Sequence, residues 1–211
     1  TRTVEITTYA EVVLAPAIAD ELHPAFSNLF VQSEIVREKQ ALLCTRRPRA
    51  HDEVPPWMFH LVAVHDADIT AISYETDRAR FLGRGNDIGA PVAVIDGRRL
   101  SNTVGPVLDP VFALRRRLWI PAGSTAKIAF WTLAAGSREA LLDAIDRHQD
   151  TNAFERAATL AWTQAQVQLR HLDIAPSQAS LYQRLAGHML YANPALRSSS
   201  DTIRRGLAPP P

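Results

Sequence analysis

Apolar and polar residues alternate along the first 135 residues, which is the pattern of β-strands with one buried face. Every second residue of segment 4–14 is apolar or threonine, so one face of this strand is predicted to be buried. Seven later runs predict further strands, at 27–36, 40–46, 57–65, 69–76, 90–96, 110–120 and 125–135. Proline, glycine and aspartate separate these runs. Short strands at regular spacing predict an antiparallel sandwich.

The period of the pattern lengthens after about residue 136, which predicts helices. Ser137 is placed to cap a helix over 137–150, and Asn152 with Glu155 has the capping-box spacing for a helix over 152–172. Trp162 lies at the centre of an apolar stripe on the second helix and is predicted to be buried. A third helix is predicted over 180–192. The chain thus divides into a β region over 1–135, a helical linker over 136–196 and a flexible, proline-rich tail over 197–211.

Composition narrows the range of functions. Hydrophobic residues make up 46% of the 211 residues, which is enough for a sizeable core, and the net charge is +1. Such a balance gives no electrostatic reason to expect a nucleic acid as partner. Cys44 is the only cysteine and lies in an apolar run, so a buried thiol is predicted. The histidine spacings fit no zinc motif, and we expect no metal and no cofactor.

Two stretches between strands invite a functional interpretation. Asp66 and Asp68 could hold a divalent cation for a nucleotide-sugar transferase, although aspartates in this position favour a turn. The run GRGNDIG resembles a phosphate-binding loop only loosely, because its third glycine comes late and a strand pattern follows it. Both stretches are therefore predicted to be turns.

The stretch YETDRARFLGRG, residues 74–85, is rich in charge. Strand alternation would place Arg78 and Arg80 on one face and Asp77 on the other. Two such arginines could bind a planar acceptor. They could equally tie neighbouring strands together through Glu75, Asp77 or Asp109, and we favour this structural network.

Six segments carry a resemblance when they are taken in order: TTYAEVVLAP, HPAFSNLFVQSE, YETDRARFLGRG, LSNTVGPVLDPVFALRRRLWIPAGSTAKIAFWT, SREALL and FERAATLAWTQAQVQLRHL. Together they resemble the phosphorylase-like region of the cyclic β-1,2-glucan synthases and, more widely, glycoside hydrolase family 94. The resemblance implies part of a galactose mutarotase-like β-supersandwich, followed by a helical linker and an (α/α)6 barrel with a catalytic aspartate. It also implies that this chain begins inside the sandwich and ends before the barrel.

The resemblance carries expectations for a larger parent protein. The parent would be a glycosyltransferase or glycoside phosphorylase that processes β-1,2-glucan, with inorganic phosphate as its co-substrate. This fragment would have no catalytic residue and no activity alone. Its expected partners are β-glucan or an oligosaccharide, the rest of the parent chain, and a second copy through the open strand 4–14. The parent would be a larger bacterial protein associated with the inner membrane, with this part on the cytoplasmic side.

The resemblance also suggests substrate-binding residues by position. A sandwich-domain loop in the phosphorylases reaches the active site of a dimer partner, and HPAFSNLF occupies the corresponding place. His23, Phe26 and Asn28 combine an aromatic face with an amide that could bind sugar hydroxyls. With Arg78 and Arg80, they form the predicted substrate-binding set. A hairpin loop that is packed by its two phenylalanines remains the alternative interpretation.

A free-standing carbohydrate-binding module is the alternative function. It would need an exposed aromatic platform on one face of a sheet. The candidates for such a platform are Trp57, Trp119 and Trp131.

Overall fold

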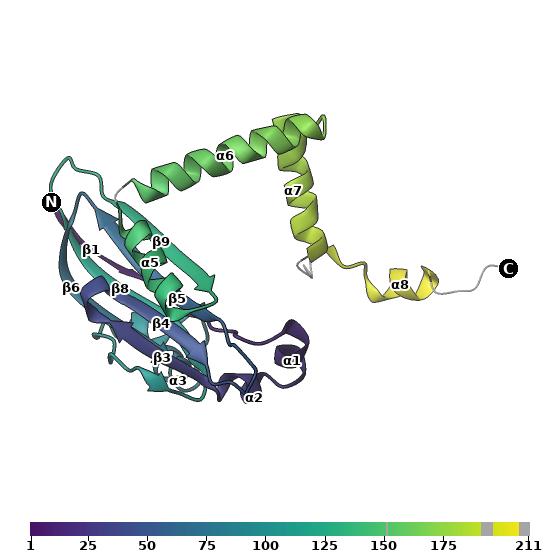
Figure 1. Cartoon of the computed structure of the whole chain (residues 1–211). Coiled ribbons are helices and arrows are strands. Elements are labelled where there is room, and N and C mark those ends of the chain that lie inside the picture. The colour runs from purple at the N-terminus through teal and green to yellow at the C-terminus, as the bar shows by residue number, and fades with distance from the viewer. Residues whose placement is uncertain (151, 191–195, 207–211) are drawn as a thin grey trace. The chain divides into compact units, whose positions relative to one another are not determined.

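The computed structural model describes residues 1–150, 152–190 and 196–206. The chain forms two compact units, Thr1–Phe154 and Glu155–Pro211. The first unit contains the described strands and helices α1 to α5, and the second contains most of α6 together with α7 and α8 (Figure 1). The predicted class, mainly β with C-terminal helices, is confirmed. No helix in the described ranges is long and apolar enough to cross a bilayer.

Strand β8 (Pro110–Ile120) is the centre of a four-stranded antiparallel sheet. One edge of β8 pairs with β6 (Asp68–Asp77), and the other pairs in tandem with β1 (Arg2–Thr7) and β2 (Ala10–Glu11). The first half of β8 is buried on both faces, so its sequence is continuously apolar there instead of alternating.

A five-stranded antiparallel sheet packs against the first. Its strand order is β7 (Gly105–Pro106), β3 (Val31–Val36), β4 (Ala41–Arg46), β5 (Trp57–His65) and β9 (Lys127–Ala135). The 3-10 helix η1 (Arg37–Lys39) joins β3 to β4, and Gln40 closes this turn at a φ of 50°. Two short helices, α1 (Ala17–Leu22) and α2 (Pro24–Asn28), connect β2 to β3.

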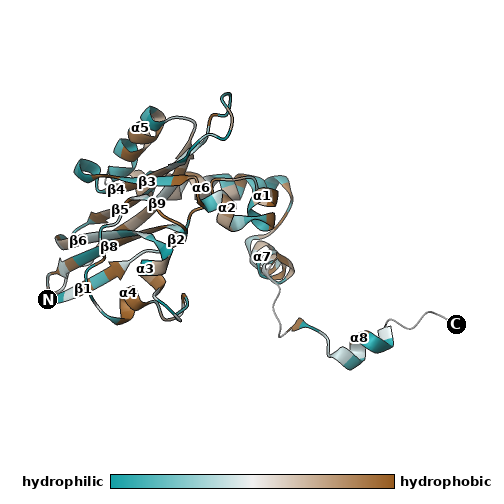
Figure 2. Ribbon diagram, turned by 90° about the horizontal axis from the view of Figure 1, so that it is seen from below, coloured by the Kyte–Doolittle hydropathy of each residue, from teal (hydrophilic) through white to brown (hydrophobic). Residues whose placement is uncertain are grey.

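Helices cover the outer face of each sheet, so the described residues of the first unit form three clusters of buried apolar side chains, one between the sheets and one on each outer face. Between the sheets lies a core that includes Val12, Leu42, Cys44, Phe112 and Leu114, which confirms the buried thiol. Helix α5 (Arg138–Gln149) packs on the five-stranded sheet, and α3 (Arg78–Leu82) and α4 (Val92–Ile95) pack on the other. Figure 2 shows α5 on one side of the strands and α3 with α4 on the opposite side.

Two segments predicted as strand or strand and turn contain short helices. Residues 90–96 contain α4, which begins directly after Pro91. The run RARFL is α3, whose first turn is capped because the Asp77 carboxylate accepts a hydrogen bond of 2.9 Å from the Ala79 amide. Tertiary packing explains the difference, because Phe81 and Leu82 of α3 are buried on the outer face of the sheet.

Helix α5 fits its sequence prediction, because the Ser137 hydroxyl accepts a hydrogen bond of 3.2 Å from the Ala140 amide. The sequence assigned this helix to a linker, whereas its buried Leu141 and Ile145 pack on the sheet of the first unit.

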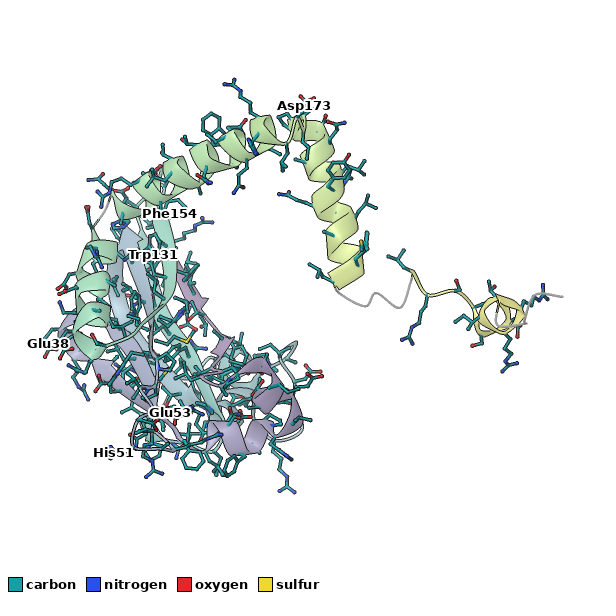
Figure 3. The ribbon with its side chains drawn as sticks, turned by 45° about the vertical axis from the view of Figure 1, so that its right-hand side comes forward. Glu38, His51, Glu53, Trp131, Phe154 and Asp173 are labelled. Carbon is teal, nitrogen blue, oxygen red and sulfur yellow. The ribbon has the colours of Figure 1, made fainter. Side chains whose placement is uncertain are left out.

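The second unit is helical. It contains α6 (Ala153–His171), α7 (Pro176–Leu190) and α8 (Ser200–Gly206), the last within the segment predicted to be a flexible tail. Asp173, labelled in Figure 3, lies in the turn after α6 in the left-handed conformation, with a φ of 54°. The prediction for Trp162 was wrong, because its side chain is 66% exposed.

Candidate functional site

Asp109, directly before β8, joins two short helices at one end of the four-stranded sheet. Its Oδ1 atom accepts a hydrogen bond of 3.0 Å from Asn28 Nδ2 at the end of α2. Its Oδ2 atom lies 3.4 Å from Arg78 Nη1 at the start of α3, and its carbonyl accepts the Arg78 amide at 3.0 Å. Two residues of the predicted substrate-binding set, Asn28 and Arg78, are thus brought together by one carboxylate.

Tyr9 and Glu11 extend this arrangement from the first strand region. Arg78 Nε lies 3.1 Å from Glu11 Oε1, which also accepts a hydrogen bond of 2.9 Å from the Tyr9 hydroxyl. The bond with Glu11 raises the pKa of Arg78, and burial raises the pKa of Tyr9. We call Tyr9, Glu11, Asn28, Arg78 and Asp109 the Asp109 network.

The Asp109 network has the chemistry of a hydroxyl-binding surface. Its amide, carboxylate, guanidinium and phenol groups donate and accept hydrogen bonds, and the side chains of Arg78, Glu11 and Asp109 are 41%, 58% and 43% exposed. Tyr9 and Glu11 were missed at the level of sequence. Their one signal was that they occupy the outward positions of segment 4–14.

Arg80 does not join the Asp109 network. Its guanidinium lies 3.6 Å from the Asp77 carboxylate and donates a hydrogen bond of 3.2 Å to the Thr103 hydroxyl. The expectation that Arg78 and Arg80 share a face opposite Asp77 was wrong, because the segment is helical and positions two apart do not face the same way.

His23 and Phe26 form an exposed surface beside Asn28. His23 separates α1 from α2, and its carbonyl accepts bonds of 3.1 Å from the Phe26 and Ser27 amides. The Phe26 ring is 52% exposed, and its edge-to-face contact with Phe30 has a centroid distance of 5.3 Å. The predicted hairpin loop is therefore a helical turn, with Phe26 only partly used for packing.

The loop after β4 borders this surface, and Figure 3 labels His51 and Glu53 in it. The Arg49 guanidinium carbon lies 4.8 Å from the Phe26 ring centroid and 5.4 Å from that of Phe30. An ion pair between Arg46 and Glu53 spans the loop. One face of Phe26 is thus covered by an arginine that this loop holds in place.

The other sequence candidates are separated or satisfied locally. Trp57 and Trp131 pack in the cluster beneath α5, whereas Trp119 belongs to β8 of the other sheet, so the three tryptophans form no common platform. Asp66 has a φ of 61° in the turn between β5 and β6, as predicted. In the described ranges, no group of three or more acidic, histidine or cysteine side chains is arranged to hold a metal.

Comparisons with known proteins agree over most of the chain. The family model of the glycosyl hydrolase 94 supersandwich domain matches residues 1–151. A cyclic beta-(1,2)-glucan synthase, NdvB of Rhizobium meliloti (strain 1021), is 38% identical over 207 residues. That similarity covers 98% of this chain but only 7% of the relative.

Proposed function

Because the chain belongs to the family of glycosyl hydrolase 94 supersandwich domains, we propose that it is one module of a larger protein that makes or processes cyclic β-1,2-glucan. The similarity to the glucan synthase carries this proposal, because it continues through the helical unit, beyond the family match. The encoding reading frame tests it. We expect the frame to continue downstream into a helical barrel, and a frame without one would contradict the proposal.

The module's role in that protein is architectural. Phosphorolysis needs an acid for the glycosidic oxygen and phosphate for the anomeric carbon, and we place the acid in the rest of the parent chain, with inorganic phosphate as its co-substrate. We therefore expect this chain alone to release no sugar 1-phosphate from β-1,2-glucan. We place the parent at the bacterial inner membrane, with this module on the cytoplasmic side.

We also propose that the surface of His23 and Phe26, with the adjoining Asp109 network, contacts glucan. The uncovered part of the Phe26 ring is suited to stack on a pyranose ring. Asn28 and Arg78 are oriented by Asp109, and their amide and guanidinium groups are suited to hydrogen-bond sugar hydroxyls. This combination of an exposed aromatic ring and partly exposed polar side chains supports a weak sugar contact.

Titration with β-1,2-linked gluco-oligosaccharides, followed by NMR, tests the contact. We expect shifts in residues 23–28 and around Asp109, and a loss of affinity of about fivefold in Phe26→Ala, since stacking contributes ~1 kcal/mol. Phe130→Ala is the matched control, because Phe130 is 50% exposed on β9, outside this surface. Equal effects of the two substitutions, or no shifts at all, would rule out the sugar contact. Neither result would bear on the proposal that the chain is a module of a larger protein, which the reading frame tests.

A further inference from the structure

Two of the three consecutive arginines of β8 lie on the outer face of their sheet and share one carboxylate. Arg115 Nε lies 3.3 Å from Glu5 Oε1, and Arg117 Nη2 lies 3.1 Å from Glu5 Oε2. Arg115 is buried, and it also donates bonds of 2.5 and 2.6 Å to the carbonyls of Ala93 and Arg98. Both outer guanidinium groups therefore have an acidic partner.

Arg116 lies between the two sheets and has no such partner among the residues that the structure describes. It is 1% exposed, and its Nη atoms donate to the carbonyls of Arg115 and Gln40, at 3.2 and 3.1 Å. Its Nε atom has no hydrogen-bond acceptor among the described residues, and no described carboxylate forms an ion pair with it. Burial lowers the pKa of Arg116 to about 10. Burying a cation without a counter-ion raises the free energy of the folded state, so an anion bound beside Arg116 would stabilise it.

A cavity of about 230 Å³ opens onto Arg116. Arg37 of η1 and Arg99 of the segment before β7 also line it, and both are exposed. Neither forms an ion pair within the described part of the chain, although Arg99 donates a bond of 2.9 Å to the Ile72 carbonyl. The remaining lining is neutral: Ile35, Gln40, Ile72, Tyr74, Asn102 and Leu114. The described lining of this cavity therefore carries three positive charges and no negative one.

We propose that this cavity binds a phosphate group, either of inorganic phosphate or of a phosphate monoester, with Arg116 at the floor and Arg37 and Arg99 at the mouth. Guanidinium forks match the oxygens of phosphate, and arginines from three separate elements suit a tetrahedral dianion better than a planar carboxylate. The cavity is large enough for a phosphate ion, since its volume of about 230 Å³ is several times the roughly 30 Å³ that one water molecule occupies in the liquid. Phosphate bound in the cavity would supply the counter-charge that Arg116 lacks among the described residues.

Titration of the chain with inorganic phosphate tests the proposal, at an ionic strength held constant with sodium chloride. We expect saturable binding, a shift of the Arg116 Nε–H resonance, and binding weakened roughly tenfold or more in Arg116→Met. Arg117→Met is the matched control, because it removes the same charge from the adjacent outer-face position, and we expect it to bind phosphate like the wild type. No saturable binding, or equal binding by wild type and Arg116→Met, would overturn the proposal.

Two variants at the exposed mouth keep the test valid if Arg116→Met fails to fold. Arg37→Gln and Arg99→Gln are each expected to weaken phosphate binding several-fold, and unchanged affinity in both would overturn the proposal. Glucose 1-phosphate serves as the monoester probe, and its binding in place of inorganic phosphate would identify a sugar phosphate as the ligand. Acetate that binds as tightly as phosphate would overturn the choice of a dianion.

Discussion

The two units differ in what covers their apolar residues. In the first unit, Phe59 and Phe112 are fully buried, because Phe59 lies beneath α5 and Phe112 lies between the sheets. In the helical unit, Trp162 and Leu172 of the equally periodic stripe are 66% and 62% exposed. Periodicity thus identifies an apolar face in both units but does not say which surface covers it. Five predictions sharpen this comparison.

The largest effect is expected in the core between the sheets. Phe112→Ala should lower the free energy of unfolding by ~3–5 kcal/mol, because it leaves a cavity and removes a ring that stacks on His60 at 5.9 Å. Urea denaturation followed by tryptophan fluorescence measures the change. A loss of unfolding free energy as small as that of a substitution at an exposed position would mean that Phe112 is no better buried than the apolar stripe of the helical unit.

The buried His60 makes the first unit sensitive to acid. It is 4% exposed, with its ring nitrogens 2.8 Å from Thr132 Oγ1 and 2.9 Å from Thr8 Oγ1. Burial, helped by the charge of Arg116, lowers the pKa of His60 to about 4. The unfolded chain, with a histidine pKa of ~6.5, therefore binds the proton more readily than the folded chain.

The resulting stability is complete above pH ~6.5 and is lost as the pH falls towards 4, by roughly 3 kcal/mol. Denaturation at a series of pH values measures this loss. His60→Gln, which retains groups able to bond Thr8 and Thr132, should lack this part of the pH dependence. If wild type and variant lose stability in parallel between pH 6.5 and 4, the pKa of His60 is not depressed.

The two adjacent buried arginines of β8 should respond differently to the same change. Arg115→Met should cost about 2 kcal/mol, because Glu5 and two backbone carbonyls lose a partner. Arg116→Met should be neutral or stabilise by up to ~1 kcal/mol in phosphate-free buffer, since it removes a buried charge that has no acidic partner in the described ranges. Thermal denaturation of both variants provides the comparison, and equal losses would contradict it.

Trp162→Ala tests the helical unit directly. The exposed ring leads us to expect a loss below about 1 kcal/mol, in place of the ~3–5 kcal/mol that a buried tryptophan would give. Denaturation monitored by circular dichroism is suitable, because it follows the helices. A loss of several kcal/mol would show that the stripe is covered after all.

The last prediction concerns association. Within the described residues β1 pairs only with β8, and β9 pairs only with β5, so each sheet has an open edge. We predict that the chain self-associates, with Arg2–Thr7 as a contact, because an open edge presents unpaired backbone groups. Sedimentation over a concentration series measures this, and a monomer with protected amides in β1 would contradict it. Association that disappears in Trp162→Glu would assign the contact to the helical stripe instead.

The sequence predicted most long elements. Alternation located β3 to β6, β8 and β9, and the Ser137 cap located α5, because these signals are local to each segment. Segment 4–14 kept its alternation, with Val12 and Leu14 buried, although it forms two strands. Short apolar runs were ambiguous, and α3 and α4 form because Phe81, Leu82 and Ala93 have a sheet face on which to pack.

The candidate site was only partly predictable. His23, Phe26, Asn28 and Arg78 were named from the sequence, but Asp109 joins Asn28 to Arg78 across 81 and 31 residues of chain, respectively. Tyr9 and Glu11 were missed because a residue in the outward position of an alternating segment gives no sign of the partner that it will meet.

By itself the sequence determined the family, the mainly β class and the faces that are apolar, because periodicity and motif order are properties of the chain alone. Only the tertiary structure decided what each face meets. Three neighbouring arginines look alike in sequence, yet Arg115 and Arg117 contact Glu5, while Arg116 is enclosed between two sheets and pairs with no acid in the part of the chain that the structure describes. The physical reason is that burial and charge compensation depend on non-local pairing, which brings β8 against strands that are distant in the chain.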